Sequence, residues 1–219
     1  SFIHHKEEKF IMKLKKIASL ALAGIMAVSM LAGCKDGGNS NSGSSSENTN
    51  TASNFTQTVL AKTSEYARSI LTVNDDENLD KAVAYVCDNS IVNSYQVGMT
   101  VEIVNNGTYN ELYANAVKYL PTSDYTWSTM NSWDFSGVTK ANETFVGMYV
   151  VGGKMTDEWI ANELATKIDG WVKNMTDEEC KYSIKIVKGT CQNDDDVSEY
   201  KTSTIVGVLV DVDNTTDNH

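Results

Sequence analysis

The stretch Tyr125–Phe135 is chemically the most varied part of the sequence, because aromatic side chains alternate there with hydroxyl, amide and carboxylate groups. Sugar rings stack their C–H faces on aromatic planes, and polar side chains beside the rings hold the sugar hydroxyls. The same residue types also anchor protein interfaces. The candidate ligand-binding residues are Tyr125, Trp127, Trp133 and Asp134. The alternative is that both tryptophans fill the core, as most aromatic side chains do.

The histidines exclude the commonest hydrolase designs. There are 3 of them, at His4, His5 and His219, so the interior of the chain has no imidazole. A Ser-His-Asp triad, a Cys-His pair and a His-ligated zinc site all need one. We therefore assign no catalytic residue and expect a non-catalytic protein. The alternative is an exported hydrolase that acts on wall or dietary carbohydrate through carboxylates.

Acidic residues gather in three stretches, Asn74–Asp80, Asn193–Glu199 and Asp211–Asp217. Calcium takes several oxygen ligands from a flexible loop, and Asp194, Asp196 and Glu199 are the best candidates for such a site. None of the stretches has the order of an EF-hand loop, which places a glycine at position six and a glutamate at position twelve. We expect solvated charge and helix-start residues there, with no metal site and no cofactor.

Three cysteines, Cys87, Cys180 and Cys191, follow Cys34 in the sequence. A bond between Cys180 and Cys191 is awkward, because the strand expected over 182–188 separates them by ~20 Å. Cys87 is a more favourable partner for either one. The pattern predicts one disulfide or buried thiols, and it leaves the pairing open.

The charge balance excludes a nucleic-acid partner. Lys+Arg number 18 and Asp+Glu 29, for a formal net charge of -11, so the chain has no surplus of cations to neutralise phosphates. Residues 1–33 hold five lysines and two glutamates, and the remainder therefore carries -14. Hydrophobic residues make up 41% of the chain, which is enough to build a core.

Residues 12–33 have the three parts of a signal peptide. Lysines open the segment, an apolar run over 17–31 follows, and Leu31-Ala32-Gly33-Cys34 closes it. The apolar run is short for a membrane span. The closing four residues resemble the lipobox of bacterial lipoprotein precursors.

This resemblance implies that Cys34 is acylated and that the peptide before it is removed. The acyl chains would hold the protein at the outer side of the cell membrane, each buried CH₂ contributing roughly 0.8 kcal/mol. The alternative is an uncleaved signal-anchor helix. Residues 1–11 precede this signal without an initiator methionine, and we interpret them as an untranslated leader.

The remaining chain divides by composition. Gly, Ser, Asn and Thr dominate residues 35–54, so we expect Cys34 and this stretch to form a flexible tether. Residues 55–213 have the length and apolar content of one domain. A polar tail, 214–219, ends the sequence.

Hydrophobic periodicity predicts the elements of the domain. Helices are expected over 55–73, 79–87, 108–120 and 156–175, and strands over 95–103, 144–151, 182–186 and 204–210. Two of the strands, 144–151 and 204–210, are apolar at nearly every position and are expected at the centre, whereas 182–186 is expected nearer an edge. The fold class is α+β, with a mixed sheet of about four or more strands and helices mainly on one face.

These features predict a lipid-anchored protein of the bacterial cell surface. It is expected to act as a binding or interaction module, with the membrane as one partner through Cys34. A glycan or an envelope protein is the expected second partner.

Overall fold

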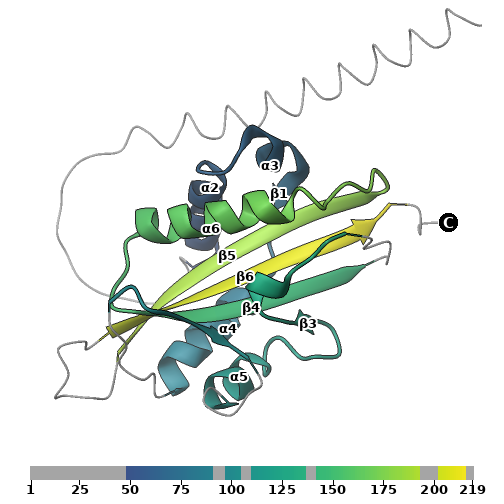
Figure 1. Cartoon of the computed structure of the whole chain (residues 1–219). Coiled ribbons are helices and arrows are strands. Elements are labelled where there is room, and N and C mark those ends of the chain that lie inside the picture. The colour runs from purple at the N-terminus through teal and green to yellow at the C-terminus, as the bar shows by residue number, and fades with distance from the viewer. Residues whose placement is uncertain (1–47, 91–96, 105–109, 137–141, 193–201, 216–219) are drawn as a thin grey trace, which may run out of the picture. The chain divides into compact units, whose positions relative to one another are not determined.

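Three long antiparallel strands, β4 (Glu143–Gly152), β6 (Thr202–Asn214) and β5 (Cys180–Gln192), form the centre of the fold (Figure 1). The computed structural model describes residues 48–90, 97–104, 110–136, 142–192 and 202–215. β6 lies between the other two strands. The strands expected over 144–151 and 204–210 correspond to β4 and β6. Their central position, predicted from continuous apolar sequence, is confirmed.

Shorter strands lie along both sides of this centre. β2 (Thr100–Ile103) is antiparallel to β4, and β3 (Thr126–Trp127) is parallel to it. β1 (Leu71–Val73) is parallel to β5. The described residues thus form a mixed six-stranded sheet in the order β1-β5-β6-β4-β2, with β3 also paired to β4. The α+β fold class and the mixed sheet are confirmed, and so is the position of 182–186 near an edge.

Helices cover both faces of the sheet, which corrects the expectation that they lie mainly on one (Figure 1). α2 (Asn48–Leu60) and α6 (Asp157–Trp171) pack on one face, and α4 (Glu77–Asn89) and α5 (Asn110–Ala116) pack on the other. The alternation of β6 shows why: Val206 and Val208 face the first layer, while Ile205 and Leu209 face the second. A strand that is apolar on both faces needs a cover on each.

Capping side chains start the helices where acidic residues cluster. Asp76 precedes α4 and accepts hydrogen bonds from the amides of Asn78 and Leu79. Thr156 precedes α6 and accepts one from the amide of Trp159 at 3.2 Å. Both first turns are acidic, which complements the helix dipole. The helix-start role expected for part of the Asn74–Asp80 stretch is confirmed.

The segment predicted as one helix over 55–73 is divided into three elements. α2 ends at Leu60, Ser64 caps the short helix α3 (Glu65–Ile70), and Leu71–Val73 is the strand β1. Apolar residues at helical spacing run through all three because each element buries one side. β1 and β3 were not predicted, since runs of three and two residues are too short to show a period.

Several predictions concern residues outside the described ranges. They include the leader, the signal peptide, Cys34 and most of the tether, together with the acidic stretch Asn193–Glu199 and the start of the helix expected over 108–120. The last part of the expected tether, 48–54, is not a flexible stretch but the first half of α2, which Phe55 and Val59 hold on the sheet. None of the helices in the described part of the chain is long and apolar enough to cross a membrane.

Candidate functional site

The outer edge of β5 is covered along part of its length. β1 pairs with Tyr182–Ile184, and the amide of Asn74 donates to the carbonyl of Ile184 at 2.9 Å. At Ile186 the cover is a side chain of α2 instead of a strand. The hydroxyl of Thr56 accepts from the Ile186 amide at 2.9 Å and donates to the Ile186 carbonyl at 3.2 Å. Within the described residues, no strand pairs with this side of β5 after Ile184.

A groove of about 420 Å³ lies beside the following residues of β5, and we call it the β5 groove. α2 contributes Phe55 and Thr58, α4 contributes Val83 and Asp88, and β5 contributes Val187–Thr190. The volume falls in the ~300–1,000 Å³ range of ligand-binding clefts. The groove thus lies where two helices from opposite faces meet the edge of the sheet.

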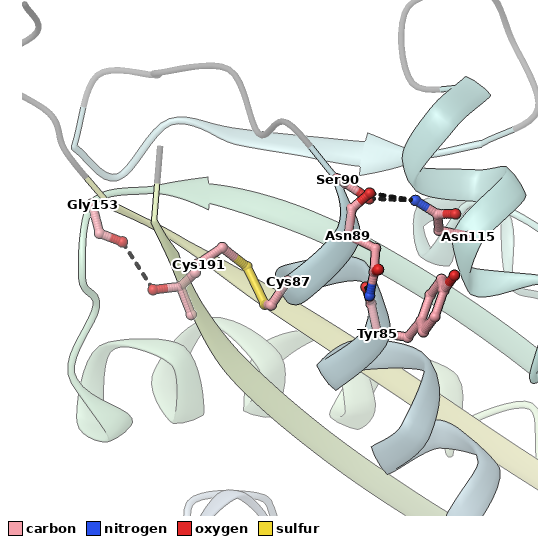
Figure 2. Close-up of a disulfide and its surroundings, with 8 residues drawn as sticks. Tyr85, Cys87, Asn89, Ser90, Asn115, Gly153 and Cys191 are labelled. Carbon is pink, nitrogen blue, oxygen red and sulfur yellow. Dashed lines mark hydrogen bonds between the residues drawn. A yellow bond between two sulfur atoms is a disulfide. The ribbon is translucent and has the colours of Figure 1, made fainter. Parts of the chain in front are cut away.

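A disulfide holds one side of the groove in place (Figure 2). It joins Cys87 of α4 to Cys191 of β5 across 104 residues of sequence, with a Cα–Cα distance of 4.7 Å. Gly189 allows the close approach, because a Cβ there would lie 2.9 Å from the Cys87 sulfur and 3.0 Å from Val83 Cγ1. The sequence left the partner of Cys87 open, and the structure pairs it with Cys191 rather than Cys180.

The end of α4 beyond the disulfide is fixed by a side chain of α5. The amide nitrogen of Asn115 donates to the carbonyl of Asn89 at 3.0 Å and to the hydroxyl of Ser90 at 2.9 Å (Figure 2). The last carbonyls of a helix need partners, and Asn115 supplies one here. α4 is therefore tied to β5 by the disulfide and to α5 by this amide.

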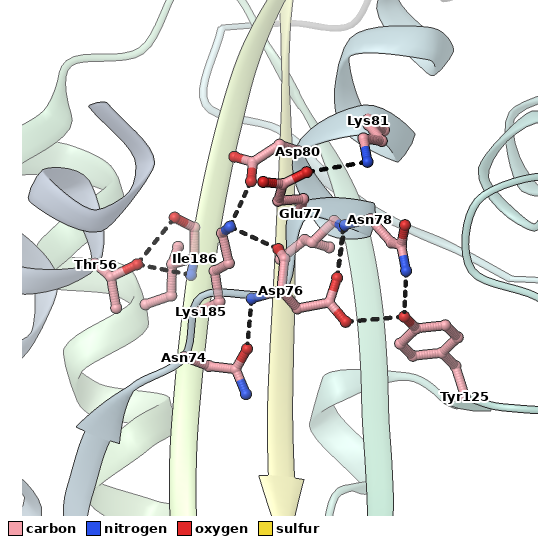
Figure 3. A network of polar contacts seen from close by, with 11 residues as sticks. Thr56, Asn74, Asp76, Glu77, Asn78, Asp80, Lys81, Tyr125, Lys185 and Ile186 are labelled. Carbon is pink, nitrogen blue, oxygen red and sulfur yellow. Dashed lines mark hydrogen bonds and ion pairs between the residues drawn. The ribbon is translucent and has the colours of Figure 1, made fainter. Parts of the chain in front are cut away.

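A buried ion pair lies near the start of α4 (Figure 3). Lys185 of β5 is 2% exposed, and its ammonium pairs with Asp80 and donates to the carbonyl of Asp76 at 2.6 Å. A buried ammonium needs such partners, since desolvation without them costs several kcal/mol, roughly. Asp80 also lines the β5 groove, so the pair positions a carboxylate at the groove surface.

Asp76 connects this ion pair to the aromatic stretch. Its carboxylate caps α4 and accepts from the hydroxyl of Tyr125 at 2.8 Å, while Asn78 donates to the same hydroxyl at 2.9 Å (Figure 3). Burial raises the pKa of Tyr125, and the negative charge of Asp76 adds to the rise. The tyrosine hydroxyl therefore serves as a fixed hydrogen-bonding group between α4 and the segment before β3.

Charged side chains surround the mouth of the groove. Lys188 pairs with Asp157 at the start of α6, and its ammonium lies 5.4 Å from the ring centre of Phe55. Asp88 is exposed, and the described residues provide it with no ion-pair partner. With Asp80 included, the groove lining contains three carboxylates and one ammonium. Its surface is therefore acidic.

The groups of the groove are suited to binding. Asp80 and Asp157 are each held by a lysine, and Lys185 lies behind the surface. The described residues contain no group of three or more His, Cys, Asp or Glu side chains able to hold a metal ion. The arrangement offers carboxylate and backbone hydrogen-bonding groups next to apolar walls.

Trp133, one of the four predicted ligand-binding residues, is a core side chain. It is 7% exposed, and its ring lies 4.7 Å from Trp171 and 6.4 Å from Phe145, measured between ring centres. Its indole nitrogen donates to the hydroxyl of Ser128 at 2.6 Å. The ring therefore packs on the α6 side of the sheet and satisfies its polar atom there.

Trp127 lies on the other side of the sheet. It stands opposite Val146 in the register of β3 and β4, and Val146 belongs to the α4 side. The half-buried ring packs 5.1 Å from Tyr113, and its indole nitrogen donates to the carbonyl of Leu120 at 2.8 Å. The two tryptophans thus do not share a surface, and the structure brings no common platform together.

The other two candidates are also separate. Tyr125 is 9% exposed, with its hydroxyl directed to Asp76. Asp134 is exposed and accepts hydrogen bonds from the amide of Ser136 and the side chain of Asn174, both at 2.9 Å. These bonds lower the pKa of Asp134. The alternative stated for the two tryptophans, a core role, describes Trp133, and Trp127 is half-buried against the core on the other face. Tyr125 is buried as well.

The sequence did not single out the residues of the β5 groove. A glycine inside a strand is a signal of close backbone approach, and Gly189 carried that signal. Asp80 and Asp88 lie eight positions apart on one helix, a spacing that places both on one side. Neither signal reveals that β1 stops at Val73 and leaves the following part of β5 uncovered.

Comparison with protein-family models, with curated proteins and with solved structures finds no match to this chain.

Proposed function

We propose that this protein is a lipid-anchored module of the bacterial cell surface that binds an envelope component in the β5 groove. The anchor is the acylated Cys34, and the support for it is the lipobox at Leu31-Ala32-Gly33-Cys34. Residues 35–47, the part of the expected tether that precedes α2, give the domain reach away from the membrane. The observation that carries the binding role is the groove of about 420 Å³ beside the uncovered edge of β5.

An envelope protein is the partner class that the site supports over a glycan. Glycan binding was expected from exposed aromatic planes, and Trp127 and Trp133 lie on opposite sides of the sheet. The groove offers instead an acidic rim and apolar walls, which suit peptide side chains. A hydrolytic role has less support, because Asp80 and Asp157 are both engaged by lysines.

Metabolic labelling with palmitate tests the anchor. The full chain, expressed in a bacterium that processes lipoproteins, is expected to take up label and to sediment with membranes. Cys34→Ser is expected to abolish both, while Cys180→Ser, the matched control, keeps both. Label that persists in Cys34→Ser would contradict the anchor.

Site-directed photo-crosslinking on intact cells tests the groove as the binding surface. A photoreactive amino acid replaces Thr58, an exposed residue of the groove wall, or Thr166, an exposed residue of α6 outside it. We expect a discrete adduct to an envelope protein from position 58 and none from position 166. Equal adducts from both positions, or none from either, would contradict the proposed binding role.

A further inference from the structure

The partly covered edge of β5 has a regular backbone orientation. In an antiparallel pair, alternate residues direct both N–H and C=O toward the partner strand, and the residues between them direct both away. Ile184 and Ile186 direct these groups away from β6, since Asn74 and Thr56 bond to them. The same parity applies to Lys188 and Thr190, which continue the strand without a break in register.

The backbone groups of Lys188 and Thr190 that point outward have no hydrogen-bond partner among the described residues. They lie where β5 lines the groove, and Thr190 is exposed. A sheet edge with free N–H and C=O groups is a template for another strand. Most proteins close such an edge, and here the described cover, β1 and Thr56, ends at Ile186 and leaves the outward groups of Lys188 and Thr190 open.

From this edge, and resting on the proposed binding function, we infer that the β5 groove binds an extended basic peptide segment of a partner protein. The segment adds to the sheet as a strand beside Val187–Gln192, in line with β1. Main-chain hydrogen bonds to Lys188 and Thr190 supply affinity, as in other cases of strand addition. Six residues of β5 extend roughly 20 Å, enough for several residues of the partner.

Charge selects the kind of peptide. The lining has the carboxylates of Asp80, Asp88 and Asp157 against the single ammonium of Lys188. Asp88 is the exposed carboxylate that the described residues leave without an ion pair, so it is the group positioned to receive a lysine or arginine. Side chains of an added strand alternate between the two faces of the sheet, so one set of the peptide faces Asp88 of α4 and the other, apolar, set meets Phe55 of α2. A second copy of this chain is disfavoured, because its net charge is -11.

Fluorescence anisotropy with designed peptides tests the inference on the full exported protein in detergent. The probe is a short fluorescent peptide of alternating lysine and valine, and a second peptide has glutamate for lysine. Two further probes carry methyl groups on backbone amide nitrogens, one at every valine and the other at every lysine. Since one alternate set of amides faces β5 in an added strand, we expect one N-methylated peptide to lose binding and the other to keep it. The glutamate peptide is expected not to bind.

Substitutions at Thr190 separate backbone from side-chain contributions. Thr190→Pro removes the outward N–H without breaking the ladder to β6, because this N–H points away from that strand. We expect roughly tenfold weaker binding, the equivalent of one main-chain hydrogen bond. Thr190→Val, which keeps the N–H, is the matched control and is expected to bind like the parent. Asp88→Asn is expected to weaken binding roughly two- to fivefold at low salt, and Glu178→Gln, an exposed carboxylate away from the groove, is not.

Three results would overturn strand addition: no binding of the lysine–valine peptide, equal binding of both N-methylated peptides, or parent-like binding by Thr190→Pro. Self-association that Thr190→Pro abolishes would overturn the assignment of a basic peptide, by identifying a second copy of this chain as the occupant. None of these results decides whether the groove binds a partner at all, because the photo-crosslink from position 58 tests that function separately. That crosslink reports an occupant of any conformation, so the two failures are distinguishable.

Discussion

β4 and β5 are the outer two of the three long strands, and the described residues cover the outward side of β4 over a longer stretch than that of β5. From Val146 to Gly152 the outward groups of β4 have partners in succession: the amide of Ser128 at 3.3 Å, the strand β2, and the bonds of residues 98 and 99 to Gly152 at 2.9 Å. On β5 the described residues supply partners only as far as Ile186. Within the described residues, the outward side of β4 is therefore closed, whereas that of β5 keeps free backbone hydrogen-bonding groups beside the groove.

This difference separates a structural region of the molecule from the region proposed to bind a partner. The aromatic stretch supplies β3, which closes the edge of β4, and the ring of Trp133, which fills the adjacent core. The varied side chains of the aromatic stretch thus serve packing and hydrogen bonding within the fold. The β5 groove has fewer large side chains, and what distinguishes it is unused backbone hydrogen-bonding capacity.

Trp133→Ala is the change with the largest expected effect, and it tests whether the closed edge is structural. It leaves a cavity beside Phe145 and Trp171. We expect the free energy of unfolding to fall by about 3–5 kcal/mol, as for other buried aromatic truncations. Urea denaturation followed by far-UV circular dichroism measures it.

The same variant sharpens the comparison when it is tested below its unfolding transition. Peptide affinity at the β5 groove is expected to stay at the parent value, because Trp133 packs against Gly147 of β4, which β6 separates from β5. A folded Trp133→Ala protein that no longer binds the lysine–valine peptide would contradict the separation of the two regions.

Removal of the disulfide has the next largest expected effect, and it acts on the open edge. Replacing Cys87 and Cys191 with alanine is expected to lower the free energy of unfolding by about 2–4 kcal/mol, since the bond closes a long loop of 104 residues. Amide hydrogen exchange is expected to rise in Val187–Gln192 more than in β4. Cys180→Ala is the control, and equal acceleration in β4 and β5 would show that the disulfide has no particular role at the groove.

The sequence predicted well the elements that have a long hydrophobic pattern and that are determined by neighbouring residues in the chain. β4 and β6 are continuous apolar runs, and α6 combines a capping threonine with a clear inward stripe. The continuous apolar runs of β4 and β6 already indicate a cover on each face of the sheet, and the expectation of helices mainly on one face did not follow that signal. β1 and β3 are too short to carry a period.

The site depends on features that no local pattern encodes. Tyr125 and Trp133 have the composition of a ligand platform, and their burial follows from how β3 joins β4. The open edge at Lys188 depends on β1 ending at Val73, although the two positions are more than a hundred residues apart. The varied chemistry of the aromatic stretch is visible in the sequence, whereas the candidate site arises from backbone groups of β5 that the described residues leave without hydrogen bonds.

Thr56→Val tests the last covered position of the open edge. Valine has a similar shape but cannot bond to Ile186, and Thr56 is fully buried. The buried amide left without its acceptor is expected to cost about 1–3 kcal/mol of the free energy of unfolding. Thr58→Val, on the exposed side of the same helix, is expected to change it by less than about 0.5 kcal/mol. Equal effects of the two changes in urea denaturation would argue that the Thr56 hydroxyl does not close the edge.

The smallest expected effect concerns Glu102 on β2, at the closed edge. Its Oε2 atom is buried with no hydrogen-bond partner among the described residues. Burial raises the pKa of Glu102 from its ordinary value of 4.5 by more than the amide of Met130 and the charge of Lys167 lower it. Between the two pKa values the folded protein keeps a proton that the unfolded chain has lost. Stability from this group is therefore present below the ordinary pKa and is lost as the pH rises through the raised one.

Glu102→Gln removes this dependence, since glutamine does not titrate. We expect the variant to lose less stability than the parent as the pH rises from the ordinary pKa of 4.5, with a difference in slope of at most one proton, or about 1.4 kcal/mol per pH unit. Urea denaturation at a series of pH values measures it, and Glu178→Gln controls for the loss of one surface charge. A parallel pH profile in Glu102→Gln and the parent would mean that the closed edge holds no buried acid, and that the two edges differ in pairing alone.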